Sequence, residues 1–150
     1  MLTAQQVADY FLTLVDEEAG DSLSNLKLQK LVYYAQGFSL ALTGKPLFDE
    51  TIEAWQHGPV VPSLYRSLRR HGSEPVPVPV NGICREDYPE DVRELLDEVY
   101  SVYGQFSASK LRNMTHQDPP WIEAMALGAP HTISRQTMKD YFPALVNGEE

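Results

Sequence analysis

The histidines, the single cysteine and the carboxylates are the side chains of this chain that could carry out acid–base or nucleophilic chemistry. The four histidines, His57, His71, His116 and His131, lie far apart and follow no zinc-ligand spacing. His57 and His116 could meet in the fold, with Asp118 as an orienting carboxylate, because catalytic triads are defined by geometry and not by chain order. A histidine-dependent hydrolase is therefore one alternative function.

No other motif of a reactive site is present in the sequence. Cys84 follows an Asn-Gly-Ile turn and has no neighbour that would mark it as a catalytic thiolate. The nine glycines form no Walker-type loop or dinucleotide fingerprint, and no Gly-x-Ser-x-Gly elbow is present. We therefore expect a protein without enzymatic activity, without a metal site and without a cofactor.

Charge restricts the class of partner. The formal net charge of -9 gives a field that repels phosphate backbones, so DNA or RNA is an unfavoured primary partner. Arg66, Arg69, Arg70 and His71 could form a small basic edge at helical spacing, which suggests a DNA-regulatory role as a further alternative. We favour the simpler interpretation of a solvated helix end, where cations are stabilised by the helix dipole.

Length and composition are those of one globular domain. The chain has 150 residues, of which 43% are apolar and 22% charged. No apolar run approaches the ~20 residues that cross a bilayer, and the first residues lack the pattern of a secretory signal. A single cysteine also fits a reducing compartment. These features predict a cytoplasmic protein that forms one domain over residues 1–150.

Capping residues and apolar spacing predict a mainly α fold of about six or seven helices. Thr3 with Gln6 is a capping box, and Ser24 caps a long second helix that ends at Gly44. Apolar or small residues on more than one side of this second helix predict a central position. The further predicted helices cover about 62–72, 89–103, 107–114, 118–128 and 134–143, and the first covers about 4–20.

Two segments are expected to be extended. Residues 50–56 show a weak two-residue alternation that is typical of a short strand. Alternating prolines exclude a helix at the start of the segment 73–88, which we expect to be an extended connector with a turn at Asn81 and Gly82. A small two-stranded β ribbon between residues 50–56 and 76–82 is an open alternative, in which Val80 and its neighbours pair near Trp55.

The run NLKLQKLVYYAQG, from Asn25 to Gly37, resembles the signature of the Panacea domain. The run WQHGPVVP, from Trp55 to Pro62, strengthens the resemblance, and similar residues continue to Phe142. Shared motif residues usually hold a fold together, so we expect most of them to be structural. These residues are Leu26, Lys27, Leu28, Gln29, Lys30, Leu31, Tyr33, Gly37, Gly58, Pro59, Val60, Ser107 and Thr115.

The resemblance implies an antitoxin of a bacterial or phage toxin–antitoxin system that neutralises its toxin by direct contact. The toxin would be encoded by an adjacent gene. At least one member of the family is a proteolytic adaptor that delivers its toxin to a Clp-type protease. Other members are described as phage-associated proteins, so a phage-associated regulatory protein is another alternative. The family pairs with unrelated toxins, and the resemblance therefore identifies neither the toxin nor the oligomeric state.

Aromatic and basic side chains are favoured as anchors in protein interfaces, and this chain combines them with acidic residues that would form the rim. The acidic residues gather in the predicted helix 89–103. The residues that we expect to contact the toxin are Tyr34, Trp55, His57, Tyr65, Arg66, Arg69, His116 and Trp121.

Overall fold

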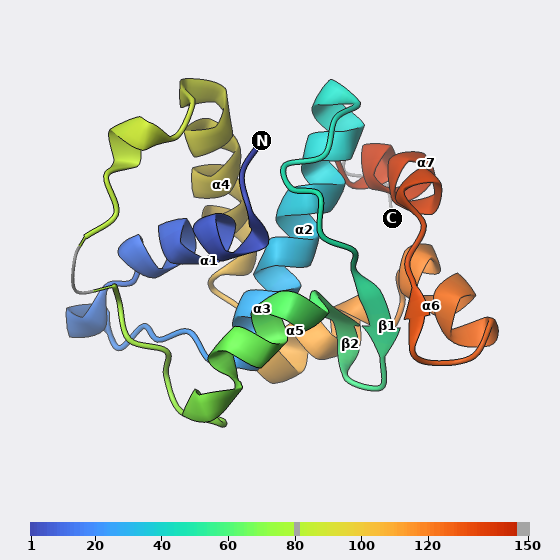
Figure 1. The fold of residues 1–150 in the computed structure, drawn as a ribbon, viewed down its shortest axis with the longest axis horizontal. Coiled ribbons are helices and arrows are strands. Elements are labelled where there is room, and N and C mark those ends of the chain that lie inside the picture. Colours follow the sequence, from blue (N-terminus) through green and yellow to red (C-terminus); the bar gives the residue numbers. More distant parts are fainter. Residues whose placement is uncertain (80–81, 147–150) are drawn as a thin grey trace.

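Helix α2 (Asn25–Thr43) runs through the middle of the molecule, and the other helices pack around it (Figure 1). The computed structural model describes residues 1–79 and 82–146. Helix α2 is buried along almost its whole length and contacts α1, α3, α4, α5, α7 and the strand β2. The predicted central position of this helix is therefore confirmed.

Seven α-helices, three short strands and three 3₁₀ turns make up the described ranges. The other helices are α1 (Ala4–Thr13), α3 (Pro62–Leu68), α4 (Glu90–Tyr103), α5 (Ala108–Thr115), α6 (Pro119–Ala126) and α7 (Arg135–Val146). The strands are β1 (Glu53–Trp55), β2 (Gly58–Val60) and β3 (His131–Thr132). The 3₁₀ turns are η1 (Glu17–Ala19), η2 (Arg69–His71) and η3 (Arg85–Asp87). The mainly α fold with a small amount of sheet is as predicted.

Local capping sets the beginning and end of the first two helices. Thr3 and Gln6 form the predicted capping box of α1, and the Ser24 hydroxyl accepts a hydrogen bond from the Lys27 amide at the start of α2. Helix α1 ends at Thr13, earlier than predicted, because the chain then enters η1. The Asp16 carboxylate caps this turn at the Ala19 amide, an example of a side chain that competes with helical hydrogen bonding.

The small sheet has an antiparallel order of β2, β1 and β3, with Ala54 opposite both Pro59 and His131. The predicted strand near residues 50–56 is therefore confirmed, but its predicted partner was wrong. Residues 76–79 form no strand, and Val80 and Asn81 lie outside the described residues. Strand β1 already pairs along both edges, so no edge is left for the proline-rich segment. That segment instead connects α3 to α4 and includes η3.

Helix α7 continues through Pro143, where the sequence predicted its end. A proline removes one amide donor from a helix, at a cost that tertiary packing can offset. Phe142 is completely buried and Leu145 packs against the core, so the last turn of α7 is held by side-chain contacts. None of the described helices combines the length and the apolar character that a bilayer crossing requires.

Helices α2 and α7 approach each other closely at Gly37. A Cβ atom at this position would collide with the ring carbons of Phe142. The group that approaches the α2 backbone here is therefore an aromatic side chain. Phe142 also packs edge to face against Tyr33, Tyr34 and Phe38, which gives the centre of the fold an aromatic core.

Candidate functional site

The beginning of strand β2 lies against a lysine of α2 whose side chain is buried. The Lys30 ammonium donates a hydrogen bond of 3.1 Å to the Pro59 carbonyl oxygen. Burial lowers the pKa of Lys30 to about 7, and repulsion by the Arg112 guanidinium adds to the shift. A Cβ atom on Gly58, whose φ is +115°, would lie 2.5 Å from the lysine Cε and 2.9 Å from the Thr115 hydroxyl. These motif residues therefore fit together by close packing.

Two buried side-chain amides connect the hairpin formed by β1 and β2, and helix α3 after it, to α2. The Gln29 carbonyl oxygen accepts a hydrogen bond of 2.9 Å from the Val61 amide, and its amino group donates to the Asn25 side chain. The Asn25 amino group in turn donates to the Tyr65 carbonyl oxygen at 3.4 Å. Because buried polar groups need partners, this chain of bonds fixes the position of β2 and α3.

Gln36 has a similar role about two helical turns further along α2. It is not among the residues that we predicted to be structural or to contact a partner. Its side chain accepts hydrogen bonds from the Leu47 and Phe48 amides and donates to the Phe48 carbonyl oxygen. The Gln36 side chain thus satisfies backbone groups of Leu47 and Phe48, in the loop that lies against α2. Its place inside the motif run was the only available signal.

The tryptophans connect the hairpin to α6. Trp121 donates a hydrogen bond of 2.9 Å from its indole nitrogen to the Trp55 carbonyl oxygen. The ring of His116 stacks on Trp121 with a centroid separation of 4.1 Å, and the ring of Trp55 meets Tyr65 edge to face at 5.0 Å. Burial, and then repulsion by Arg112, lowers the pKa of His116. These aromatic residues therefore stabilise the hairpin as well as border the surface.

The structure brings His57 and His116 near the same loop, and the hydrogen bonds of the described residues join neither ring to a nucleophile. Nδ1 of His57 accepts a hydrogen bond of 3.3 Å from Arg112, and the buried Nε2 of His116 has no partner in the described part of the chain. The two carboxylate oxygens of Asp118 accept hydrogen bonds from the hydroxyls of Tyr33 and Tyr141. The nucleophile–base hydrogen bond of a triad is thus missing from the contacts of these histidines.

Cys84 is exposed and donates to the Glu86 carboxylate at 3.3 Å, a bond that raises the pKa of its thiol. A raised pKa disfavours the reactive thiolate. Over residues 1–79 and 82–146, no group of three or more histidine, cysteine or carboxylate side chains could hold a metal ion.

The residues predicted to contact a partner differ widely in their exposure. Tyr34 is only 1% exposed and stacks on Tyr103 at 4.1 Å, so it packs in the core, where it also lines a pocket. His57, Arg66 and Arg69 are exposed and Trp55 and Tyr65 are half-buried, and we name these five residues the hairpin face. His116 and Trp121 are half-buried beside the hairpin.

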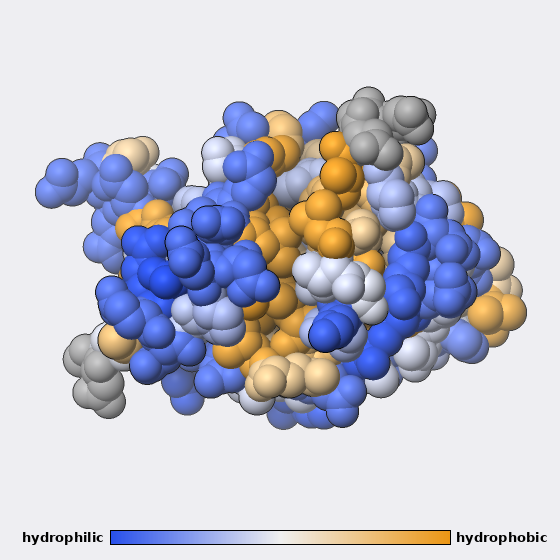
Figure 2. Space-filling view, turned by 90° about the horizontal axis from the view of Figure 1, so that it is seen from above, coloured by the Kyte–Doolittle hydropathy of each residue, from blue (hydrophilic) through white to orange (hydrophobic). Residues whose placement is uncertain are grey.

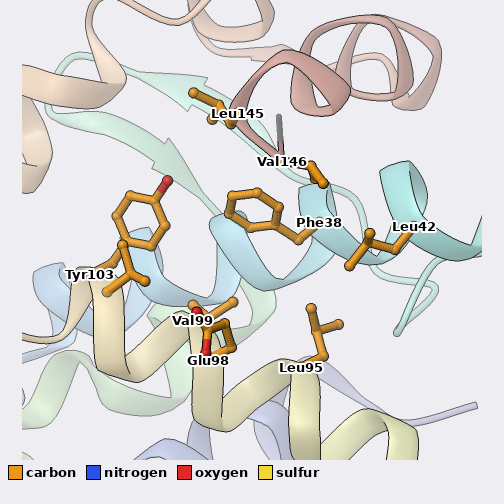
Figure 3. A pocket seen from close by; sticks show the side chains of 9 residues that line it. Phe38, Leu42, Leu95, Glu98, Val99, Tyr103, Leu145 and Val146 are labelled. Carbon is orange, nitrogen blue, oxygen red and sulfur yellow. The ribbon is translucent and has the colours of Figure 1, made fainter. Parts of the chain in front are cut away.

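An apolar groove lies between α2, α4 and α7 (Figure 3). Its volume is about 230 Å³. The groove is lined by Phe38, Leu42, Leu95, Glu98, Val99, Val102, Tyr103, Leu145 and Val146. Figure 2 shows an apolar strip in the middle of the face seen from above, with hydrophilic surface on both sides. Helical periodicity did not reveal this groove, because a spacing rule cannot tell which apolar positions stay uncovered.

A second hollow, which we name the tyrosine pocket, adjoins the groove because Tyr103 and Leu145 line both. Its volume is about 570 Å³. Its other lining residues are Tyr34, Phe106, Lys110, Met114, Gln117, Asp118, Pro119 and Tyr141.

A protein-family model matches the part of the chain that contains most of these residues. The model of the family described as "Antitoxin SocA-like, Panacea domain" matches residues 28–122, which is more than half of the chain. The chain belongs to the Panacea-domain family. The resemblance inferred from the motif runs is therefore confirmed.

A curated relative of this Panacea protein is "Antitoxin SocA" of Caulobacter vibrioides (strain NA1000 / CB15N). The two sequences are 33% identical over 112 residues, which cover 66% of this chain and 58% of the relative. The chain thus spans less than two thirds of the length of that relative. No solved structure matches the chain significantly.

The residues of the Panacea motif have clear structural partners in the fold. Lys27 donates to the Gly104 carbonyl oxygen at 2.6 Å, and the Ser107 hydroxyl caps α5 at the Lys110 amide. The Thr115 hydroxyl donates to the Arg112 carbonyl oxygen. The remaining motif side chains of α2 and β2 that are buried are Leu28, Leu31, Tyr33, Pro59 and Val60, while Leu26 is half-buried. These motif residues therefore form part of the scaffold of the fold.

Proposed function

We propose that this Panacea protein is an antitoxin that neutralises a cognate protein toxin by binding to it directly. The family match over residues 28–122 is the observation that carries the proposal, since the family is named for an antitoxin. The geometry supports it, because the hydrogen bonds of His57, Cys84 and Asp118 pair no nucleophile with a base. A scaffold of this kind acts on another molecule by covering part of its surface.

The hairpin face is the first surface that we propose for contact with the toxin. Tyr65 is half-buried against Trp55, while Arg66 is exposed one residue further along α3. Tyrosine and arginine are both residue types that interfaces use as anchors. The half-buried His116 and Trp121 would support this contact from α6 and the end of α5.

Co-expression with the product of an adjacent gene tests the proposal. We expect that the gene alone arrests growth, that this chain restores growth, and that the two proteins purify together as a stable complex. Tyr65→Ala with Arg66→Ala should weaken the complex, whereas the same changes at the distant exposed pair Gln136 and Lys139 should not. Unchanged toxicity together with no recoverable complex would refute the antitoxin function.

We further propose a cytoplasmic location and, as a refinement of the antitoxin function, delivery of the bound toxin to a Clp-type protease. The family resemblance motivates this refinement. Occlusion of the toxin and its delivery to a protease both begin with the same complex, so complex formation alone does not distinguish them. The half-life of the toxin, measured in the presence of this chain in cells with and without the protease, separates them. A half-life that does not depend on the protease would leave occlusion as the mechanism.

A further inference from the structure

The apolar groove exposes side chains that a folded protein usually covers. Leu42 is 59% exposed, Val146 is 43% exposed and Val102 is 39% exposed, and the three come from α2, α7 and α4 respectively. Leu42 and Val146 lie around the hollow together with Phe38 and Val99 (Figure 3), and Val102 is a further lining residue. Because three helices supply neighbouring exposed apolar groups, the groove is a continuous patch and not a scatter of single residues.

The edge of the groove is acidic. Among the described residues that line it, Glu98 is the only charged one, and Glu94 and Asp91 precede it on α4 by four and seven residues. Residues at this spacing lie along one face of a helix, and all three carboxylates are exposed. The acidic stripe therefore borders the apolar floor along α4.

Two helix ends add to the negative potential beside the groove. Leu42 and Val146 lie in the last turns of α2 and α7, and neither turn contains a basic residue. The carbonyl end of a helix carries a partial negative charge, which no lysine or arginine inside either turn offsets, although Lys45 lies two residues beyond the end of α2. The Asp118 carboxylate in the adjoining tyrosine pocket extends the acidic character, although Lys110 also lines that pocket.

The dimensions of the groove suit one helix. Its lining on α4 extends from Leu95 to Tyr103, which at 1.5 Å per residue corresponds to about 12 Å, or roughly two helical turns. A helix of about this length or slightly longer buries its apolar residues at positions i, i+3, i+4 and i+7 in such a groove. Its flanking residues then face the acidic stripe on α4.

We propose that the apolar groove is the docking site for a basic amphipathic α-helix of a partner protein. The partner is the toxin, so this inference rests on the proposed function and adds the chemistry of recognition. Apolar side chains of that helix fill the space between Leu42, Val102 and Val146, and its lysines or arginines face Glu98 and Glu94. A second copy of this chain does not fit, because both copies would bring acidic stripes to the same interface.

Two synthetic helical peptides test the chemistry of the groove on the full chain. Both carry leucine at the same i, i+3, i+4 and i+7 positions, and the other positions are lysine in one peptide and glutamate in the second. We expect the lysine peptide to bind about tenfold or more tightly than the glutamate peptide, with a difference that shrinks as salt is added. Equal affinities, or no binding of the lysine peptide, would overturn the proposal.

Matched pairs of variants test whether the lysine peptide binds in the apolar groove. Leu42→Arg with Val102→Arg changes residues that are already exposed, so the fold should be kept, and this variant should lose the lysine peptide. The control is Leu127→Arg, since Leu127 is 70% exposed on the end of α6 and lies outside the groove. Glu98→Lys should likewise weaken binding, while Glu123→Lys makes the same change of charge on α6 and should not. Equal losses in the two members of either pair would contradict a site in the groove.

Protection of cells from the toxin and the oligomeric state of this chain are the last two measurements of the test. If the wild-type chain fails to protect cells, the proposed function fails, whatever the peptides do. If the wild-type chain protects, the Leu42→Arg and Val102→Arg variant should lose protection and Leu127→Arg should keep it. Equal protection by both variants would remove the groove as the toxin site. A dimer that forms at micromolar concentration and is broken by the groove variant would show that a second copy occupies it.

Discussion

Lys30 shows how one side chain can be required by a fold and still oppose its stability. The ammonium is completely buried, and Pro59 provides one carbonyl oxygen for it. Removing a cation from water favours its neutral form, which is why the pKa of Lys30 falls from 10.5 to about 7. The aliphatic stem meanwhile fills the space below Gly58.

The pH dependence of unfolding tests this description of Lys30. Between pH 7 and 10.5 the unfolded chain binds more protons at this lysine than the folded chain, so the free energy of unfolding rises with pH in that window. Relative to Lys30→Met, the wild type should gain about 2 kcal/mol on going from about pH 7 to about pH 9. Denaturant titrations of both proteins measure the difference. Lys139→Met is the control, since it makes the same substitution at an exposed side chain.

The indole of Trp121 tests the attachment of the hairpin to α6. Trp121→Phe keeps a ring for stacking on His116 but leaves the Trp55 carbonyl oxygen without its donor, so the free energy of unfolding should fall by about 1–2 kcal/mol. Trp55→Phe is the matched control, because its indole donates to the Glu53 carboxylate, which can bind water instead. Urea unfolding compares the two. Equal losses would mean that the carbonyl bond has no special importance.

At the scale of elements, the contact between α2 and α7 organises the core. Gly37 gives room for the ring of Phe142, which in turn touches Tyr33, Tyr34 and Phe38. This contact also positions the last turn of α7, and with it the Val146 side of the apolar groove. A glycine in the middle of a helix is therefore explained here by packing, since its φ is not in the left-handed region.

Replacement of Gly37 separates packing from helix propensity. Alanine stabilises a helix interior by about 1 kcal/mol relative to glycine when nothing opposes it. Here the added methyl group would meet the ring of Phe142, so Gly37→Ala should instead lower the free energy of unfolding by about 1–3 kcal/mol. Adding Phe142→Leu should recover part of that loss, which a double-mutant cycle would measure. A more stable Gly37→Ala protein would show that the ring moves aside easily.

At the scale of the whole molecule, the net charge of -9 affects how a partner arrives. A field of one sign raises the rate of encounter with an oppositely charged protein and has less influence on how long the complex lasts. The acidic stripe of α4 concentrates this field beside the apolar groove. Charge therefore raises the association rate of a basic partner, and burial of apolar side chains in the groove slows its dissociation.

Association kinetics test this division between charge and burial. For a basic toxin, the association rate constant should fall by about tenfold or more between roughly 0.05 M and 0.5 M salt, because ions screen the long-range attraction. The dissociation rate constant should change much less, since it depends on contacts in the bound state. Stopped-flow mixing of the purified proteins gives both constants. An association rate that does not respond to salt would contradict electrostatic steering.

The sequence alone determined those features that depend on local chemistry. Thr3 and Ser24 begin helices because their hydroxyls satisfy backbone donors within the next turn, and Gly44 ends α2 because it reaches the left-handed region without strain. The Panacea motif was likewise readable, because Lys30 and Gly58 lie in two continuous runs. Their shared packing explains why these residue types occur together.

Only the tertiary structure decided which distant segments meet. Strand β1 pairs with β3 instead of the proline-rich segment, and Pro143 stays inside α7, because long-range packing outweighs weak local preferences. The same reason placed Tyr34 in the core although its residue type suits an interface. The apolar groove also depends on three helices that are separate in sequence, so exposure at Leu42, Val102 and Val146 follows from how those helices end and pack.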